Sequence, residues 1–315
     1  MRILLTGIGG PAGICFAKSL SLNEIEDIIL GADGGEGKYG KELVSSFYKI
    51  PMANDPTYLD KLNELIDKEK INYLIPLVDE ELPIISFNQN KIHCRVLISP
   101  YETIKYTTDK IKIYEKLDKY LPRRIPYDNL EFPLFVKPRI GRGAKDVHLI
   151  ETKEDLSQYD PNKYIYQEVL LQPEITVDSL FDNNGKLLIE VQRVREVVEE
   201  AICIKGRIIK DKEISTVIKE ISNIFKFIGP INFQFMKSEK ERYKLTEINA
   251  RSSGGMGITV NSGVNIPYII INLLRKYHFN EMNYKIQLPT ISTGVFDNFS
   301  EIIERQKEKM KAKIR

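Results

Sequence analysis

The chain has 315 residues, of which 42% are apolar, and 46 basic side chains nearly balance 44 acidic ones to leave a net charge of +2. That length predicts about two packed domains, and the charge balance excludes a protein that coats nucleic acid. No apolar run approaches the ~18 residues of a membrane span. Three widely spaced cysteines and the absence of a signal-peptide pattern predict a reduced, cytoplasmic protein with no nucleic-acid or membrane partner.

The first hundred residues alternate between short apolar runs and helical patterns. Residues 3–6 are apolar, a glycine-rich turn follows over 7–13, and Ile14, Phe16, Ala17 and Leu20 then recur at helical spacing. Apolar runs at 28–30, 73–78 and 95–98 predict further strands, and Asp55-Pro56 predicts the start of another helix. Alternating strands and helices predict a parallel, doubly wound sheet.

The sequence pattern changes near Ser99-Pro100, where we expect a domain boundary. A Lys-rich helix is expected over 109–117, and short strands over 133–137, 147–150, 164–169, 175–181 and 186–191. The turn Asp182–Gly185 predicts a hairpin between the last two. An apolar stripe over 214–228 predicts a helix that Gly229-Pro230 ends, followed by strands at 231–236 and 243–248. The sequence after Ser99-Pro100 therefore predicts an antiparallel sheet.

The N-terminal glycine turn is the first candidate site. Gly7, Gly9 and Ala12 fit G-x-G-x-x-G/A, and Asp33 lies 20 residues after Gly13. Such a turn either binds a dinucleotide phosphate at a helix N-terminus, with Asp33 on the ribose, or simply packs a strand closely against a helix. The first alternative implies an NAD(P)-dependent oxidoreductase.

A second candidate is the basic glycine loop over 135–145. Lys137 stands on a predicted strand, and the loop after it carries Gly141, Arg142 and Gly143. Glycines let backbone amides approach phosphate oxygens, and a fixed lysine supplies a point charge beside them. The alternative is an exposed basic hairpin.

A third candidate is a row of polar side chains on two neighbouring strands. Glu247, Asn249 and Arg251 alternate along one strand, and Asn232 and Gln234 share a face of its partner. Hard oxygen ligands on adjacent strands suit Mg²⁺ that is shared with substrate phosphates. The alternative is a face that is exposed to solvent.

Residues 166–171, with Glu174 just beyond, form a fourth candidate. This pattern is typical of an edge strand beside an adenine ring, followed by a carboxylate that binds the ribose. The alternative is an ordinary strand end. Arg193 and Arg195 point to one side of an extended segment, either over a phosphate or into solvent. The three histidines show no metal-ligand spacing, and Ser252 and Ser253 lack a nucleophile-elbow context.

Taken in this order, the segments resemble the ATP-grasp superfamily, in particular the synthetase units of the carbamoyl phosphate synthase large chain. The resemblance covers nearly the whole chain and is strongest at Gln234 with Glu247-x-Asn249-x-Arg251. It also includes Thr108-Asp109-Lys110, Phe135–Pro138 and Gly141–Ala144. It implies an α/β fold in which a Rossmann-like pre-ATP-grasp domain (1–105) precedes a two-lobed α+β ATP-grasp domain (106–315). The small lobe would span about 106–170 and the large lobe about 171–315.

The resemblance also implies roles for individual residues. ATP would be contacted by Lys110, Lys137, Gly141, Arg142, Gly143, Glu168, Leu170, Glu174 and Arg193. Mg²⁺, with Mn²⁺ as a substitute, would be bound by Gln234, Glu247 and Asn249, and Arg251 and Lys137 would be catalytic. Two departures from the family stand out: Gln172-Pro173 replaces a common glycine, and Gln234 replaces a common acid.

The function implied is an ATP- and Mg²⁺-dependent ligase that joins a carboxylate to an amine, or another nucleophile, through an acyl phosphate and releases ADP and phosphate. The substrates would be small molecules, and a homodimer is common among such proteins. A single copy of the unit argues against the full carbamoyl phosphate synthase reaction. The alternatives are the oxidoreductase above and an ATP-binding protein of this fold without catalysis.

Overall fold

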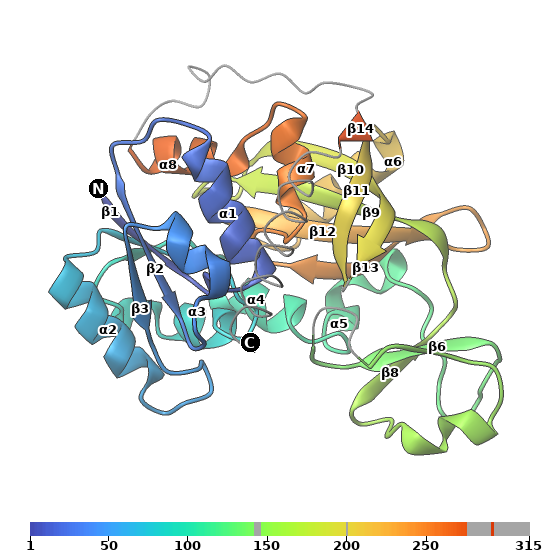
Figure 1. The fold of residues 1–315 in the computed structure, drawn as a ribbon. Helices are drawn as coiled ribbons and strands as arrows, with labels where there is room; N and C mark the ends of the chain where they lie inside the picture. The colour runs from blue at the N-terminus through green and yellow to red at the C-terminus, as the bar shows by residue number, and fades with distance from the viewer. Residues whose placement is uncertain (142–145, 200, 276–290, 293–315) are drawn as a thin grey trace, which may run out of the picture.

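The computed structural model describes residues 1–141, 146–199, 201–275 and 291–292, which form three sheets (Figure 1). The predicted nucleotide contacts Arg142 and Gly143 lie outside the described residues. Within the described part of the chain, no helix is long and apolar enough to cross a bilayer.

The N-terminal sheet is parallel, as the alternation of strands and helices predicted. Its order is β3 (Ser46–Lys49), β2 (Ile28–Asp33), β1 (Arg2–Thr6), β4 (Tyr73–Pro76) and β5 (Arg95–Val96). The helices of this part are α1 (Pro11–Ser21), α2 (Tyr58–Glu69) and α3 (Leu82–Phe87), with 3-10 turns η1 (Lys38–Leu43) and η2 (Gln89–Lys91).

Side chains of β1 alternate between two apolar cores. Ile3 and Leu5 pack in the core that contains α1, whereas Leu4 packs in the core that contains Tyr58 and Leu62 of α2. Both cores continue into the large antiparallel sheet described next. The N-terminal domain is therefore packed directly onto that sheet.

The second sheet has six strands in antiparallel pairs. Their order is β13 (Tyr243–Asn249), β12 (Gly229–Lys237), β9 (Leu171–Phe181), β10 (Leu187–Glu199), β11 (Ile202–Ile209) and β14 (Ile291–Ser292). The helices α4 (Tyr101–Thr107), α6 (Lys212–Ser222), α7 (Met256–Asn261) and α8 (Ile266–Leu274) belong to this half. The predicted hairpin is confirmed, since the Asp182 carboxylate accepts from the N–H groups of Asn184 and Lys186 at 2.9 and 2.8 Å.

The third sheet forms a small lobe with its own core. Its order is β7 (His148–Ile150), β6 (Leu134–Pro138) and β8 (Tyr164–Gln167), all antiparallel. The 3-10 turn η4 (Glu154–Gln158) adds Leu156 to this core. The helices α5 (Tyr114–Leu117) and η3 (Asp118–Tyr120) instead pack in the core of the large sheet. In Figure 1 the lobe lies at one end of the molecule, away from the N-terminal sheet. The domain boundaries near residues 105 and 170 remain our proposal.

Two predicted helices are shorter in the structure. Over 109–117 only Tyr114–Leu117 is α-helical. The N–H groups of Tyr114 and Glu115 bond three residues back, to the carbonyls of Ile111 and Lys112, so the stretch before the helix consists of turns. The helix expected over 214–228 ends at Ser222. Phe225 lies beyond that end and packs 6.1 Å from the Phe227 ring, so the apolar spacing continues without the helix.

The elements that the sequence patterns missed include β3, α3, α4, β11, α7 and α8. Gly206 lies inside β11, where a Cβ would approach the Val194 carbonyl oxygen to 2.8 Å, and a strand-interior glycine weakens the pattern. Helix α7 carries glycine and β-branched residues with low helix propensity. Burial of Met256 and Ile258, rather than propensity, accounts for this helix.

Candidate active site

A cavity of about 810 Å³ lies where the three sheets meet. It is bounded by β6 of the small lobe, by the polar face of the large sheet and by the N-terminal turn Gly9–Ala12. Every described residue to which the ATP-grasp resemblance assigns a role lines it: Lys110, Lys137, Gly141, Glu168, Leu170, Glu174, Arg193, Gln234, Glu247, Asn249 and Arg251. Segments more than a hundred residues apart in the chain therefore converge on one site.

Strand register explains how the large sheet builds its polar face. Arg193 pairs with Thr176, Thr176 with Gln234, and Gln234 with Glu247, so these four residues form one row across four strands. In the next row Asp178 pairs with Asn232, and Asn232 with Asn249. Residues two apart on a strand share a face, so both rows face the same way.

This face is not a solvated one. Asn232 is 2% exposed and Asn249 is 7% exposed, and both contribute to the cavity wall. The Asn249 amide donates to Asn232 Oδ1 at 3.5 Å and to Glu247 Oε2 at 3.3 Å. The solvent-exposed alternative for this candidate is therefore wrong.

Glu247 is held ionised between two lysines. The Lys110 Nζ lies 3.3 Å from Glu247 Oε1. Burial alone would raise the pKa of Glu247, but the Lys110 and Lys137 ammonium groups outweigh burial and hold that pKa below its usual value. The site thus offers a partly buried carboxylate with two cations beside it.

Lys137 is buried at 8% exposure, and its Nζ donates to the Thr246 carbonyl at 3.0 Å. The pKa of Lys137 is lowered to about 8, chiefly by burial and also by the Lys110 charge, while the Glu247 and Glu174 carboxylates oppose that shift. The side chain is charged at neutral pH and close to the point where it loses its proton.

Lys110 reaches the cavity because its loop is tied to the end of β6. The Arg139 guanidinium forms a two-pronged ion pair with Asp109, and Lys110 N–H donates to the Arg139 carbonyl at 3.0 Å. The Lys110 Nζ also donates to the Gly141 carbonyl at 2.6 Å. This arrangement joins Lys110 to the start of the glycine loop.

The far end of the cavity carries the predicted adenine and ribose residues. The Glu168 carboxylate accepts from the Arg123 N–H at 2.8 Å, so this side chain fixes the strand edge. Glu174 forms an ion pair with Arg195 at 2.7 Å. Burial raises the pKa of Glu174, and the Arg195 charge opposes that rise.

Arg193 forms a buried ion pair that the sequence did not predict. Its Nε lies 3.1 Å from the Asp178 carboxylate, and its Nη2 donates to Ser253 Oγ at 3.1 Å. The side chains of Arg193 and Asp178 are 2% and 0% exposed. Asp178 is the one charged residue in the buried part of β9, Ile175–Phe181, and an acid inside such a stretch is the signal that could have identified it.

Arg251 connects the cavity to the N-terminal domain. Its Nη2 donates to the Asp79 carboxylate and, at 3.4 Å, to Asn249 Oδ1, while its Nη1 donates to the Ser252 carbonyl at 2.8 Å. Asp79 lies shortly after β4, at the carboxyl end of the parallel sheet. Its distance of 172 positions from Arg251 hides the pair from sequence reasoning.

Hydrogen bonds to Asp33 and close packing against Val78 fix the glycine turn. Gly9 N–H donates to Asp33 Oδ2 at 2.8 Å, and Gly35 N–H donates to Asp33 Oδ1 at 2.7 Å. Gly7 has φ +65°, and a Cβ there would lie 1.8 Å from a Val78 methyl group. These contacts favour the close-packed strand-to-helix turn over a ribose-binding role for Asp33.

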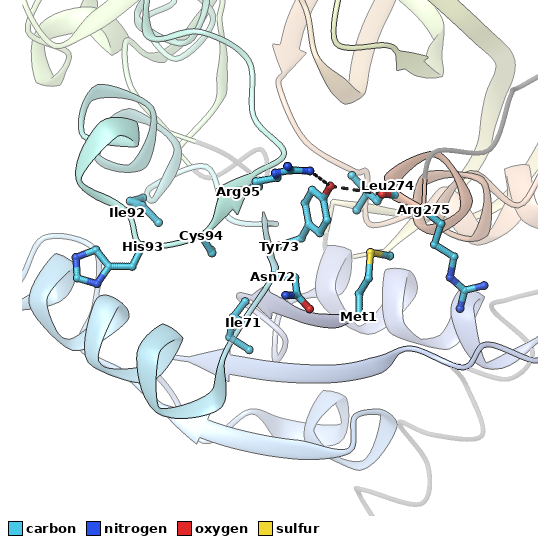
Figure 2. Close-up of a pocket in the computed structure, with 10 residues that line it drawn as sticks. All are labelled: Met1, Ile71, Asn72, Tyr73, Ile92, His93, Cys94, Arg95, Leu274 and Arg275. Carbon is cyan, nitrogen blue, oxygen red and sulfur yellow. Dashed lines mark hydrogen bonds between the residues drawn. The ribbon is translucent and has the colours of Figure 1, made fainter.

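A second cavity, of about 880 Å³, lies at the amino ends of the parallel strands (Figure 2). There the Tyr73 hydroxyl accepts from Arg95 Nη1 at 2.9 Å and donates to the Leu274 carbonyl at 3.4 Å. None of the predicted site residues lines it.

The donor set suits a magnesium ion completed by a nucleotide. Within the described residues no three His, Cys, Asp or Glu side chains come together as a metal site. Glu247 is one carboxylate, and Gln234 and Asn249 add amide oxygens on the same wall of the cavity. Mg²⁺ typically takes one or two carboxylates and completes its shell with phosphates and water.

Comparisons with known proteins agree with this geometry. Residues 160–293 match the family model "ATP-grasp in the biosynthetic pathway with Ter operon", and residues 40–97 match "PylC-like, N-terminal domain". A carbamoyl-phosphate synthase of Methanobrevibacter smithii is 20% identical in an alignment of 297 residues that covers 84% of this chain and 79% of the relative.

Solved structures show the same fold. The N5-carboxyaminoimidazole synthetase of Staphylococcus aureus complexed with ADP aligns with a TM-score of 0.67 at 14% identity, over 98% of this chain and 97% of that one. The L-amino acid ligase of Bacillus licheniformis aligns with a TM-score of 0.69 at 15% identity, over 91% and 77%. The parallel N-terminal sheet and the two antiparallel lobes thus give the chain the ATP-grasp fold, and residues 160–293 match an ATP-grasp family model.

Proposed function

We propose that this chain is an ATP- and Mg²⁺-dependent ligase that activates a carboxylate as an acyl phosphate and joins it to an amine or another nucleophile. ADP and orthophosphate would be released. One observation carries the proposal: the ionised Glu247 carboxylate, flanked by Lys110 and Lys137, shares a cavity wall with two amide side chains.

The nucleotide would lie along the cavity with its phosphates toward Lys110 and Lys137. Gly141 begins the loop beside them, and the small lobe would cover the base near Glu168 and Leu170. Glu174, fixed by Arg195, would accept from the ribose hydroxyls. The two lysines lower the electrostatic cost of bringing a polyphosphate beside the Glu247 carboxylate.

Gln234, Glu247 and Asn249 would hold the magnesium ion, which neutralises charge on the terminal phosphates when bound. Their positions on paired strands fix the ligand oxygens before the nucleotide arrives. Such preorganisation reduces the reorganisation that the reaction requires.

The remaining steps depend on positioning. A substrate carboxylate attacks the γ-phosphorus in line, ADP leaves, and the nucleophile then displaces orthophosphate from the acyl phosphate. Arg251 lines the cavity beside Asn249 and would contact the acyl phosphate. No side-chain nucleophile is needed.

The relatives support this chemistry without identifying the substrates. Their printed names include a carbamoyl-phosphate synthase, an N5-carboxyaminoimidazole synthetase and an L-amino acid ligase. We infer small-molecule carboxylate and amine substrates and a cytoplasmic location, and a homodimer remains a prediction.

The proposal is tested by thermal unfolding with ATP, ADP, NAD⁺ and NADH, each with and without Mg²⁺, because a ligand that binds the folded state raises the unfolding temperature. We expect a magnesium-dependent shift with ATP and ADP that Glu247→Gln abolishes. Glu241→Gln, an exposed change in the same β-hairpin, is the control and should leave the shift intact. Phosphate release in a carboxylate-by-amine screen then identifies the substrates.

Other outcomes favour the alternatives. A shift with NAD(H) alone would contradict the proposal and favour the oxidoreductase. Binding of MgATP without phosphate release across a broad panel would favour an ATP-binding protein that lacks catalysis.

A further inference from the structure

The ion pair between Arg251 and Asp79 joins the N-terminal domain to the reaction site. Asp79 follows β4 at the carboxyl end of the parallel sheet, and Arg251 follows β13 of the large sheet. Their side chains are 19% and 12% exposed, so the pair is largely shielded from water. An ion pair in such surroundings is screened less than a surface pair.

The guanidinium of Arg251 is held by three acceptors. Asp79 and Asn249 Oδ1 accept from Nη2, and the Ser252 carbonyl accepts from Nη1. Of the three, Asp79 alone comes from another domain and alone carries charge. Without it, two neutral acceptors close to Arg251 in sequence would be left to hold a flexible side chain.

Asp79 itself sits on an anchored turn. Glu81 N–H donates to the Val78 carbonyl at 3.2 Å, and Leu82 N–H donates to the Asp79 carbonyl at 3.3 Å. The Glu81 carboxylate accepts from Thr6 Oγ1 at the end of β1. The parallel sheet therefore determines where the Asp79 carboxylate lies.

We propose that Asp79 is a positioning residue, which fixes the Arg251 guanidinium where the acyl phosphate forms. This inference rests on the proposed function and adds to it a role for the N-terminal domain in the chemistry. A guanidinium placed before the reaction stabilises developing charge, whereas a mobile one must first be ordered.

A competing role gives the opposite prediction. If Asp79 only neutralises Arg251, its removal would strengthen the attraction between Arg251 and an anionic substrate. Asp79→Asn keeps an acceptor oxygen and loses the charge, whereas Asp79→Leu loses both. Comparing the two variants therefore separates positioning from neutralisation.

The test uses the reverse half-reaction with MgADP and acetyl phosphate. The phosphoryl group leaves the acetyl oxygen and bonds to the terminal oxygen of ADP, giving acetate and ATP, which luciferase detects. We expect Asp79→Leu to lower kcat by about 100-fold, the scale of a misplaced catalytic group. Asp79→Asn and Asp79→Glu should each lose less than about tenfold, because both keep an acceptor for Arg251.

The controls separate a local effect from a structural one. Asp67→Asn makes the same change at an exposed carboxylate of the N-terminal domain and should behave as wild type. The affinity for MgADP should stay unchanged in every Asp79 variant. The positioning role would be overturned if Asp79→Asn and Asp79→Leu both bound acetyl phosphate more tightly than the wild type and had an equal or higher kcat.

Binding of acetyl phosphate to the MgADP complex, measured by thermal unfolding, decides the proposal even without turnover. If the wild type binds acetyl phosphate but makes no ATP, and the carboxylate-by-amine panel also releases no phosphate, the proposed function fails. Asp79 still positions Arg251 toward a bound acyl phosphate if acetyl phosphate binding is weaker in Asp79→Asn than in the wild type and weaker again in Asp79→Leu. If the wild type does not bind acetyl phosphate although MgADP binds, the positioning role is overturned.

Discussion

Gln234 and Glu247 face each other across the paired strands β12 and β13, so an amide and a carboxylate occupy adjoining positions on the wall of one cavity. The Lys110 ammonium lies 3.3 Å from that carboxylate. The proposed magnesium site would therefore have one ionised ligand, Glu247, and two neutral ones, Gln234 and Asn249, where two lysines already supply positive charge. A metal ion here depends on the charge that the nucleotide phosphates bring.

Gln234→Glu should tighten magnesium binding. The change adds a second carboxylate beside Glu247 at constant size, and affinity for hard cations rises with ligand charge. We expect the Mg²⁺ concentration that gives half of the ADP-dependent thermal shift to fall by roughly tenfold, or about 1.4 kcal/mol. Gln89→Glu, an exposed position of η2, is the control. An unchanged requirement for Mg²⁺ would remove Gln234 from the proposed ligand set.

Lys137 should make nucleotide affinity depend on pH. Its pKa of about 8 means that the ammonium is present at pH 7 and is lost as the pH rises above 8. MgATP affinity should therefore decline between pH 7.5 and 9.5, and calorimetry across that range measures it. Lys137→Met should bind weakly at every pH and show no such decline. A decline of the same size in Lys137→Met would assign it to another group.

The same lysine should affect the stability of the ligand-free protein. Its pKa in the folded state lies below its ordinary value, so the unfolded chain binds more protons between about pH 8 and 10.5. The free energy of unfolding should rise with pH across that window, by at most about 3 kcal/mol. Denaturant unfolding of the wild type and of Lys137→Met across this pH range tests the prediction. The free energy of unfolding of Lys137→Met should not show this rise.

Sequence patterns found this site because its residues repeat at strand spacing. Glu247, Asn249 and Arg251 occupy alternate positions of one segment, and strand geometry alone places them on a common face. The glycine turn was ambiguous, since Gly7–Gly13 suits both a phosphate and a close-packed turn. The bonds from Gly9 and Gly35 to Asp33, which favour the second, depend on where the backbone lies in space.

Long-range partners were beyond sequence reasoning. Asp178 and Asp79 are fixed by which strands become neighbours and by how the domains pack. Local propensity also failed where tertiary burial decides, as in α7, whose sequence favours helix poorly but whose side chains are buried. The parallel sheet was predictable because its pattern of alternation is local.

Glu81 should make the protein less stable as the pH rises. Burial raises the pKa of Glu81 to about 7, and the Asp33 and Glu80 charges add to that rise, while bonds from Thr6 and Tyr58 oppose it. The folded protein therefore binds more protons than the unfolded chain between about pH 4.5 and 7, and this contribution to stability is lost across that window.

Glu81→Gln should remove the contribution. The amide has no charge to desolvate, so the variant should be about 1–3 kcal/mol more stable than the wild type at pH 8 and nearly equal at pH 5. Urea unfolding at both values measures the difference. Glu36→Gln, which removes an exposed carboxylate of the same domain, should show no such pattern. If the stability of Glu81→Gln relative to wild type is lower at pH 8 than at pH 5, the predicted direction of the pH dependence is wrong.

Asp178→Asn should destabilise the fold more than any surface charge change. Asp178 Oδ2 accepts from Arg193 Nε at 3.1 Å and from Thr259 Oγ1 at 2.6 Å, and Oδ1 accepts from Asn232 at 3.2 Å. Removing the negative charge leaves the Arg193 guanidinium buried without its counter-ion, which costs about 3–5 kcal/mol. Arg193→Met alone strands the Asp178 charge and should cost a similar amount.

The double variant decides whether burial of an unpaired charge is the cause. Asp178→Asn with Arg193→Met leaves no ion in the core, so it should be more stable than either single variant. Urea unfolding of the four proteins forms the cycle. Additive losses would show that the two side chains act through separate contacts, and the destabilisation would then be attributed to the lost bonds from Thr259 and Asn232.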